Sequence, residues 1–264
     1  MSSELSGKRA LVTGSTAGIG LATAVGLAAA GADVVVNGRS EKRVARAVET
    51  LRARVPGALV SGVAADVSTP EGCAALAAKA TEIDILVNNV GIFEPKGFLA
   101  ITDDDWTRLF ETNVMSGVRL VRHVLPRMQE NDWGRIVFVS SESAVQIPVE
   151  MIHYGMTKTA QVAVARGLAE SLAGTGVTVN SVLAGPTRSE GVGRFVEELA
   201  AERGADPEQV EREFFETARP SSILKRFLRV DEVAAMIVYL CTPQASGTTG
   251  SAVRVDGGVV RAVL

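Results

Sequence analysis

One stretch of sequence decides the fold: Leu11-Val12-Thr13-Gly14-Ser15-Thr16-Ala17-Gly18-Ile19-Gly20, in which a β-rich run ends and an alanine-rich run begins. Its three glycines permit a tight turn and a close approach of the backbone to a ligand. A helix that starts here directs its free N–H groups and the positive end of its dipole at that ligand, which suits a pyrophosphate. The stretch therefore predicts a dinucleotide site contacted by Gly14, Ser15, Thr16, Gly18, Ile19 and Gly20.

Outward from this turn, β-rich runs alternate with segments of helical periodicity or propensity. The predicted strands are Arg9–Val12, Val34–Asn37, Leu59–Val63, Ile83–Val87, Arg135–Val139, Val177–Val182 and Ala252–Val255. The predicted helices are Ile19–Ala30, Glu41–Arg54, Pro70–Lys79, Thr102–Met128, Tyr154–Ala173 and Asp231–Leu240. Continuously apolar strands are typical of a parallel sheet covered on both faces. We expect a single α/β domain over residues 1–264, a doubly wound, Rossmann-type parallel sheet of about seven strands.

The charged segment Arg188–Arg219 interrupts the alternation and predicts inserted helices. Asp206 followed by Pro207 is typical of a helix start. The segment has an apolar side made of Phe195, Val196, Leu199, Val210, Phe214 and Phe215. Two interpretations remain open: a surface pair of amphipathic helices, or a lid over a substrate pocket at about residues 188–222.

Composition excludes several classes of protein. The chain has 264 residues, 47% of them apolar and 22% charged, which argues against disorder. The net charge of −3 argues against nucleic acid or an anionic membrane as a partner, and the first ten residues lack the apolar core of a secretory signal. Cys73 and Cys241 are expected to be buried thiols, and we predict a cytoplasmic protein without a metal site.

The end of the second predicted strand bears on which dinucleotide is bound. An acidic residue there would hydrogen-bond a free ribose 2′-OH, but this chain has Asn37-Gly38-Arg39-Ser40. The guanidinium of Arg39 can instead pair with a 2′-phosphate, so we expect NADP rather than NAD. In the alternative interpretation Arg39 is a surface residue and Glu41 reaches the ribose.

Three side chains are candidates for the chemistry. Tyr154 and Lys158 are four residues apart on a predicted helix and so share a face. A tyrosine phenol has a pKa of ~10, and a neighbouring ammonium favours the phenolate, so Lys158 is expected to lower the pKa of Tyr154. Ser141 ends a strand thirteen residues before Tyr154, at the sheet edge where such folds bind ligands. Ser140 and Ser143 remain competitors.

These motifs together resemble the classical short-chain dehydrogenase/reductase family over nearly the full chain. The resemblance is carried by the glycine-rich turn, by Asp66 after the third strand, and by Asn88-Asn89-Val90-Gly91 after the fourth. It is also carried by a tetrad that matches by position and spacing, and by Asp256-Gly257-Gly258 near the end. The tetrad is Asn113, Ser141, Tyr154 and Lys158.

The resemblance implies roles for these residues. Tyr154 would be the acid/base, Lys158 would bind the nicotinamide ribose and lower the pKa of Tyr154, and Ser141 would steady the substrate carbonyl. Asn113 would hold a water of the proton relay, although Asn113 and Asn88 could equally bond the backbone between elements. The remaining implied cofactor contacts are Asp66 and Val67 at the adenine, Asn89 at the adjoining ribose, Gly91, Gly185, and Thr187 at the nicotinamide amide.

Some positions depart from the family pattern. Val90 replaces an alanine and adds bulk near the cofactor, and Ala184 stands where a proline usually precedes the glycine of the loop over the nicotinamide. Gly155-Met156-Thr157 replaces the commoner residues before Lys158 but leaves the Tyr–Lys spacing intact. The resemblance also implies a homo-oligomer, a tetramer or dimer, assembled through helices Thr102–Met128 and Tyr154–Ala173.

The function expected from the sequence is hydride transfer that interconverts a ketone and a secondary alcohol. Enoyl reductases that resemble this family separate Tyr and Lys by more than four residues, which favours a carbonyl substrate. A 3-oxoacyl thioester is the first candidate, with a sugar, steroid or other small ketone left open. The alternative is a catalytically silent NADP(H)-binding sensor or structural protein of the same fold.

Overall fold

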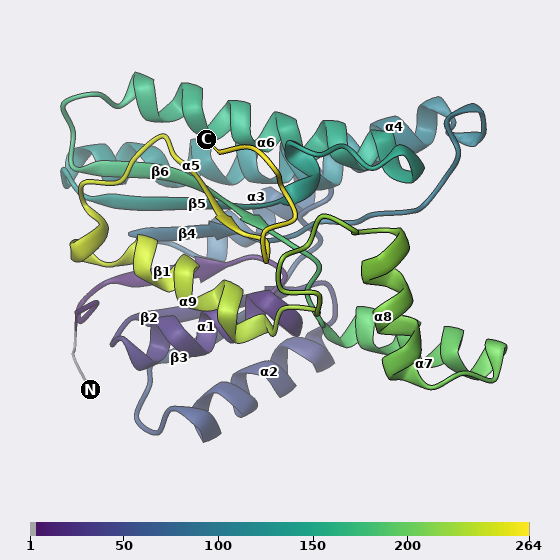
Figure 1. Cartoon of the computed structure of the whole chain (residues 1–264). Helices are drawn as coiled ribbons and strands as arrows, with labels where there is room; N and C mark the ends of the chain where they lie inside the picture. The colour runs from purple at the N-terminus through teal and green to yellow at the C-terminus, as the bar shows by residue number, and fades with distance from the viewer. Residues whose placement is uncertain (1–3, 264) are drawn as a thin grey trace.

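The computed structural model describes residues 4–263, without the side chains of residues 194, 195 and 198. Phe195, predicted on the apolar side of the insert, therefore has its side chain outside the described part. The described residues form a seven-stranded sheet in the order β3-β2-β1-β4-β5-β6-β7, with every pairing parallel (Figure 1). The strands are β1 (Arg9–Val12), β2 (Asp33–Gly38), β3 (Val60–Ala64), β4 (Ile85–Asn88), β5 (Gly134–Ser141), β6 (Val177–Ala184) and β7 (Ala252–Val255).

The strand order places the ligand-binding edge. The chain builds outward from β1 to β3 and then returns to the other side of β1 to form β4. Ligands bind in doubly wound sheets beyond the carboxyl ends of the strands at such a reversal. The glycine-rich turn follows β1 and Ser141 is the last residue of β5, so both lie at this edge. The predicted Rossmann-type fold is confirmed.

Helices cover both faces of the sheet (Figure 1). One face packs against α1 (Gly18–Ala29), α2 (Glu41–Arg54) and α9 (Val230–Cys241). The other packs against α3 (Pro70–Lys79), α5 (Ser116–Glu130) and α6 (Ile152–Ser171). The apolar strands are buried between the two layers, as their lack of alternation predicts. Within the described residues, no helix has the length and apolar character needed to span a bilayer.

The predicted helix Thr102–Met128 is wrong in one respect, because it is not continuous. It consists of α4 (Asp103–Phe110), a π-helical turn (Glu111–Met115) and α5. Thr102 caps α4 and forms a capping box with Asp105, so the acidic run there serves the helix start. Such π-turns occur at functional sites, and this one contains Asn113. The other predicted elements differ from the structure by one or two residues at each end.

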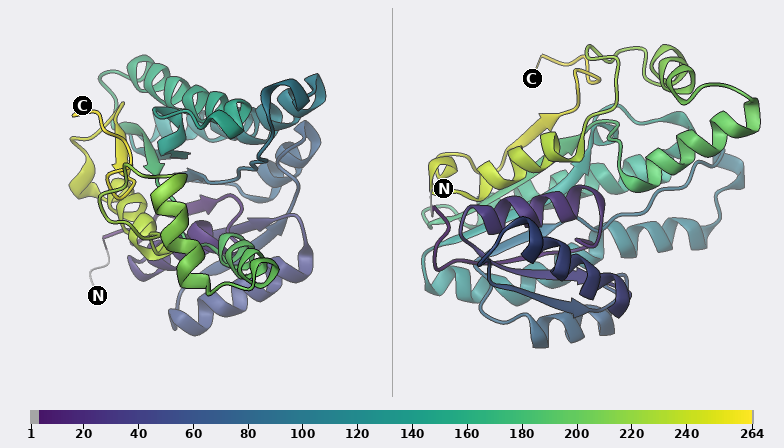
Figure 2. Two further views of the ribbon diagram at one scale, coloured as in Figure 1. Left: turned by 45° about the vertical axis from the view of Figure 1, so that its right-hand side comes forward. Right: turned by 90° about the horizontal axis from the view of Figure 1, so that it is seen from below.

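The inserted segment forms α7 (Glu190–Arg203) and α8 (Pro207–Thr217), capped by Ser189 and Asp206. Figure 2 shows this helix pair standing beside the sheet rather than on either covered face. The pair has a small core of its own, made of Val196, Ala200, Val210, Phe215 and Phe227. A cavity of about 540 Å³ lies between residues 146–150 and residues 217–219 at the end of α8.

Candidate active site

The glycine-rich turn has the geometry of an anion site. Gly14 and Gly18 have φ angles of +60° and +58°, a region that glycine enters without strain. A Cβ at Gly20 would lie 2.5 Å from Asn89 Nδ2 and 2.6 Å from the carbonyl oxygen of Gly14, so only glycine fits there. The N-cap of α1 is Ala17, which offers no side-chain cap, so the first N–H groups of the helix are left for a ligand. These features fit a dinucleotide pyrophosphate.

Side chains of the turn hold its shape. The Ser15 hydroxyl donates to the carbonyl oxygen of Val12 at 2.7 Å and accepts from the Asn37 N–H at 3.0 Å. Ser15 is fully buried, so its hydroxyl is committed inside the turn and only its backbone can face a cofactor. Asn37 also donates through Nδ2 to the carbonyl oxygens of Val63 in β3 and Ala65 just after it, each at 3.2 Å. The asparagine at the end of β2 thus has a structural function that its sequence position did not reveal.

The predicted adenine end is more open. Arg39 is exposed at the end of β2, next to Gly38, whose missing Cβ makes room for Thr16. Asp66 is exposed, and its carboxylate accepts from the N–H and the hydroxyl of Ser68. Val67 is 2% exposed and packs into the core, so its backbone and not its side chain can meet an adenine.

Ser141, Tyr154 and Lys158 line one cavity of about 200 Å³ at the sheet edge. Lys158 Nζ lies 5.6 Å from the centre of the Tyr154 ring. Phe93 packs edge-on against the same ring, with centroids 6.0 Å apart. Other predicted cofactor residues line this cavity as well: Ile19, Asn89, Gly91, Gly185 and Thr187.

A buried glutamine that the sequence reasoning missed holds the lysine. Lys158 Nζ donates to the carbonyl oxygen of Val139 at 2.9 Å and to Gln161 Oε1 at 3.1 Å. Gln161 is 1% exposed, and its Nε2 donates to the main-chain oxygen of Asn113 at 2.6 Å. The only sequence signal was a polar residue one turn beyond Lys158 on the buried face of α6. Gln161 therefore makes a direct side-chain link between the lysine and Asn113.

The Asn113 side chain is also fully engaged. Its Oδ1 accepts from the N–H of Ile92 at 2.8 Å, and its Nδ2 donates to the Ile92 oxygen at 2.9 Å and to Thr157 at 3.0 Å. Asn113 thus bonds the backbone of the loop after β4, as one of its two interpretations predicted. The side chain of Asn88 does not bond the backbone, because its buried amide has no hydrogen-bond partner among the described residues.

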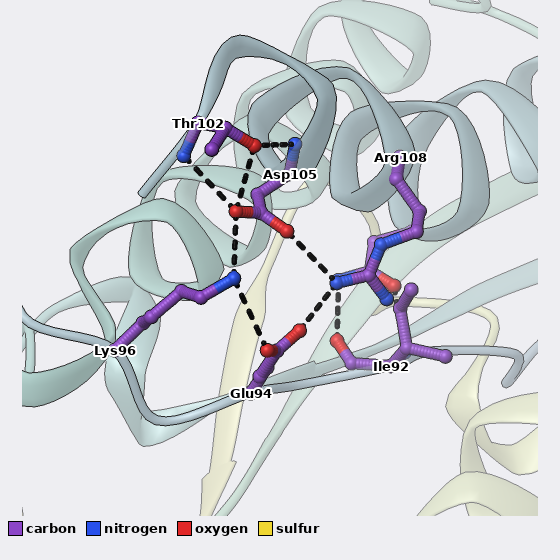
Figure 3. Close-up of polar contacts among 7 residues, drawn as sticks. Ile92, Glu94, Lys96, Thr102, Asp105 and Arg108 are labelled. Carbon is purple, nitrogen blue, oxygen red and sulfur yellow. Dashed lines mark hydrogen bonds and ion pairs between the residues drawn. The ribbon is translucent and has the colours of Figure 1, made fainter. Parts of the chain in front are cut away.

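The loop after β4, which carries Phe93, is anchored to α4 by four charged side chains (Figure 3). Lys96 Nζ lies 2.8 Å from Asp105 and 3.3 Å from Glu94. Arg108 pairs with both carboxylates. The hydrogen bonds from Lys96 and Thr102 hold the pKa of Asp105 well below its usual range. This anchoring holds the loop beside the catalytic candidates.

A second loop lies at the predicted nicotinamide end of the site. The Gly185 N–H donates to the Val255 oxygen at 2.9 Å, and a Cβ at Gly185 would lie 2.6 Å from the backbone of Asp256. The Asp256 carboxylate in turn accepts from the N–H of Gly258 at 2.9 Å. Thr187 donates to the Gly185 oxygen at 2.8 Å, so the residues after β6 and β7 support each other.

The pKa of Tyr154 contradicts one expectation. Burial raises this pKa well above its ordinary value, and the charge of Glu142 raises it further, while Ser141 and Arg219 lower it. Lys158 was expected to lower this pKa, but its ammonium donates to Val139 and Gln161. Burial lowers the pKa of Lys158 to about 8, against an opposing effect of Glu142. The phenol is thus protonated near neutral pH, the form that donates a proton.

The residue before Tyr154 is a buried histidine. His153 is fully buried, packs edge-on against Trp106, and is not among the residues that line the cavity. Burial lowers the pKa of His153, so its ring is neutral near pH 7. Among the described residues no cluster of His, Cys, Asp and Glu could hold a metal ion.

Comparison with known proteins defines the class. A family model described as "Enoyl-(Acyl carrier protein) reductase" matches residues 14–260. An uncharacterized oxidoreductase of Bacillus subtilis, YvaG, is 45% identical over the full length of both chains. The 3-oxoacyl-[acyl-carrier-protein] reductase FabG of Aquifex aeolicus is 33% identical, covering 98% of this chain and all of its own.

The fold comparison agrees. L-sorbose reductase from Gluconobacter frateurii, solved with NADPH and L-sorbose, matches over 100% of both chains with a TM-score of 0.93 and 32% identity. The chain therefore belongs to the short-chain dehydrogenase/reductase family of oxidoreductases, as its motifs predicted.

Proposed function

We propose that this protein is an NADP(H)-dependent oxidoreductase that interconverts a ketone and a secondary alcohol. The observation that carries the proposal is the shared cavity of Ser141, Tyr154 and Lys158, which opens beside the glycine-rich turn at the carboxyl edge of the sheet. Such an edge is where doubly wound sheets bind nucleotides. The family to which the chain belongs supports the reaction class.

The chain's own residues account for binding and proton transfer. The backbone of the turn and the N-terminus of α1 would hold the pyrophosphate, and the bound nicotinamide would supply or accept the hydride. Tyr154 would donate its phenolic proton to the substrate oxygen, and Ser141 would hydrogen-bond that oxygen. The ammonium of Lys158, which donates to Val139 and Gln161, would use its remaining N–H to bind the nicotinamide ribose.

The protonated state of Tyr154 near neutral pH suits the proton donation that carbonyl reduction requires at the substrate oxygen. Oxidation of an alcohol requires the phenolate, so the rate in that direction should rise with pH.

The preference for NADPH over NADH rests on the end of β2. Asn37 is buried and hydrogen-bonded inside the turn, so no acidic group there meets a ribose 2′-OH, while Arg39 is exposed beside Gly38. Fluorescence titration should show tighter binding of NADPH than of NADH. Arg39→Gln should weaken NADPH binding by about 10- to 150-fold and leave NADH unchanged, because it removes one charged hydrogen bond of about 1.5–3 kcal/mol. Equal losses for both nucleotides would contradict this preference.

A 3-oxoacyl thioester remains the first candidate substrate, and keto sugars and other small ketones are alternatives. FabG of Aquifex aeolicus is named as a reductase of 3-oxoacyl thioesters, and the L-sorbose reductase structure contains a keto sugar. The matching family model carries the description of an enoyl reductase, but the four-residue spacing of Tyr154 and Lys158 favours a carbonyl substrate over an enoyl one.

The deciding experiment follows NADPH oxidation against a panel of ketones and 3-oxoacyl thioesters, beside Tyr154→Phe. We expect turnover by the wild-type protein and a loss of about 10²–10⁴-fold in the variant, the usual contribution of a general acid. NADPH binding should be retained in both. If both bind NADPH and neither reduces any substrate, the protein is a nucleotide-binding sensor or structural member of the family.

Three further properties belong to this proposal. The protein is a single domain over residues 1–264, in which α7 and α8 act as a lid at about residues 188–222 over the cavity beside Arg219. It assembles as a homotetramer or dimer through α4, α5 and α6. A monomer in light scattering after size exclusion would contradict this assembly.

The protein works in the cytoplasm on a small molecule, without nucleic acid or membrane as a partner, in keeping with its net charge of −3.

A further inference from the structure

A buried ion pair connects the catalytic wall with the helical insert. Glu142 directly follows Ser141 and is 4% exposed, and Arg219, two residues beyond α8, is 8% exposed. Arg219 Nε donates to Glu142 Oε1 at 2.9 Å, and Arg219 Nη1 lies 3.5 Å from Glu150 Oε1. The other oxygen of Glu142 accepts a hydrogen bond from the Ser141 hydroxyl. One carboxylate therefore links the candidate catalytic serine to a cation from the insert.

This arrangement governs what the serine can do. A hydroxyl has a single proton to donate, and Ser141 gives it to Glu142 while accepting from the N–H of Ser143 at 3.1 Å. While this hydroxyl donates to Glu142, it cannot donate to a substrate carbonyl. Arg219 donates to the other oxygen of the same carboxylate, so Glu142 keeps a buried partner when the Ser141 hydroxyl turns to a substrate. Without that partner, burying the carboxylate would be costly.

The charge of Glu142 also reaches the proton donor. It raises the pKa of Tyr154 and that of Lys158, whereas Arg219 lowers the pKa of Tyr154. The groups around this carboxylate come from four segments. They are Ser141 of β5, Tyr154 and Lys158 of α6, Glu150 of the turn Val149–Met151, and Arg219 after α8.

We propose that Glu142 and Arg219 are positioning residues: Arg219 holds the Glu142 carboxylate, which directs the Ser141 hydroxyl and sets the charge around Tyr154. The inference rests on the proposed function, in which Ser141 and Tyr154 act on the substrate oxygen. Because Arg219 lies in the segment that leaves α8, docking of that segment completes the site. The insert then contributes to the chemistry and does not merely cover a pocket.

The pH profile of alcohol oxidation tests the pair, because that direction requires the phenolate of Tyr154. Glu142→Gln should move the acidic limb of kcat/KM down by about 1 pH unit, since it removes a negative charge near the phenol. Arg219→Gln should move the limb up by about 1 unit, since it leaves that charge unbalanced. The double variant should lie between them, and Arg219→Lys should recover part of the shift.

A matched control separates this effect from general damage to the insert. Arg203 pairs with Glu213 at 3.3 Å between α7 and α8, and both side chains are exposed. Arg203→Gln removes the same kind of cation from the same insert without contact to Glu142. It should leave the pH profile unchanged, and a shift as large as that of Arg219→Gln would overturn the proposal.

A second readout needs no turnover and keeps the two proposals apart. The chain has two tyrosines, Tyr154 and Tyr239, so Tyr239→Phe leaves Tyr154 as the only one. Incorporating 3,5-difluorotyrosine, whose phenol is more acidic, then lets ¹⁹F NMR follow ionisation of this residue alone in the folded protein. The pKa should be lowest with Glu142→Gln, intermediate in the parent and highest with Arg219→Gln.

Identical ¹⁹F titrations in the three proteins would overturn the pairing, whatever the activity. The expected order in a protein that reduces no ketone would support the pairing and defeat the proposed function. If Arg219→Gln fails to fold, Glu142→Gln and Arg219→Lys carry the same test. Glu142→Gln removes the buried carboxylate charge, and Arg219→Lys keeps a cation beside it, so neither leaves Glu142 as an unpaired buried charge.

Discussion

The glycine-rich turn, whose Ile19 reaches the cavity, and the wall formed by β5 and α6 meet at one site, yet they are built in different ways. The turn is made of backbone and small residues, with Gly14 and Gly18 at positive φ and free N–H groups at the start of α1. The wall is made of side chains, with the ammonium of Lys158 held by Gln161 and the hydroxyl of Ser141 held by Glu142.

Because of this difference, different kinds of substitution should disturb the turn and the wall. A backbone site is disturbed by steric change, because any added Cβ occupies the space of the ligand or of a neighbouring chain. A side-chain site is disturbed by a change of charge or hydrogen bonding, because its groups are buried and each needs a partner. Substitutions should therefore separate nucleotide binding from proton transfer.

The largest expected effect is in the turn. Gly20→Ala places a Cβ 2.5–2.6 Å from the Asn89 side chain and the Gly14 oxygen. We expect a loss of about 1–3 kcal/mol in the free energy of unfolding, as is usual for overpacking, and nucleotide binding weakened by about tenfold or more. Urea unfolding and NADPH fluorescence titration measure the two effects.

The control is another helical glycine. Gly167 of α6 has no atom within 4 Å of an added Cβ, so Gly167→Ala should raise stability by about 0.5–1 kcal/mol. If Gly20→Ala binds NADPH as tightly as this control, the backbone interpretation of the turn is wrong.

In the wall, Gln161→Leu should impair chemistry and spare nucleotide binding. It removes the donor to the Asn113 oxygen and leaves Val139 as the partner of the Lys158 ammonium, at a cost of about 1–3 kcal/mol. We expect kcat to fall while the dissociation constant of NADPH stays the same. Gln161→Glu should instead raise the pKa of Lys158, because a carboxylate beside an ammonium favours the charged form. A parallel loss of kcat and of NADPH affinity in Gln161→Leu would contradict the separation of the two regions.

The pH dependence of reduction should report on Lys158. Its pKa of about 8 means that the ammonium is present below this pH and lost above it. Carbonyl reduction should therefore decline as the pH rises through about 8, and Gln161→Glu should move that decline upward. A reduction rate that is flat to pH 10 would show that the charge of Lys158 is not needed.

The same lysine affects stability with a defined sign. Its pKa in the folded protein lies below the ordinary value of 10.5, so between the two values the unfolded chain binds more protons. The free energy of unfolding contributed by this group therefore increases from pH 8 to pH 10.5. Urea unfolding of Lys158→Met, compared with the wild type at both ends of this range, should lack that increase.

The smallest effect is expected at the surface of the loop after β4. Lys96→Met removes one cation shared by Glu94 and Asp105, but Arg108 still pairs with both carboxylates, and the partly exposed Lys96–Glu94 pair is screened by salt. The change in urea midpoint should be smaller than that of Gln161→Leu, and it should shrink further in 1 M NaCl. A larger effect would mean that this network, and not the buried one, holds the loop in place.

The sequence was sufficient for the elements and for the principal site residues. Periodicity and glycine spacing are local properties, so the strands, the turn after β1 and the cap at Thr102 could be predicted from neighbours in the chain. The convergence of Ser141, Tyr154 and Lys158 was also predictable, because the carboxyl ends of parallel strands share one edge. The π-turn at Asn113 was missed, since helix propensity runs through it without interruption.

Sequence by itself determined a doubly wound sheet with a glycine-rich turn and a tyrosine–lysine pair, because each depends on residues close together along the chain. Only the tertiary structure decided that Gln161 holds the lysine, that Glu142 is paired with Arg219 from seventy-seven positions away, and that the pKa of Tyr154 is raised. The reason is physical: burial and long-range charge pairing depend on which surfaces meet in space, and no local pattern of residue types encodes that.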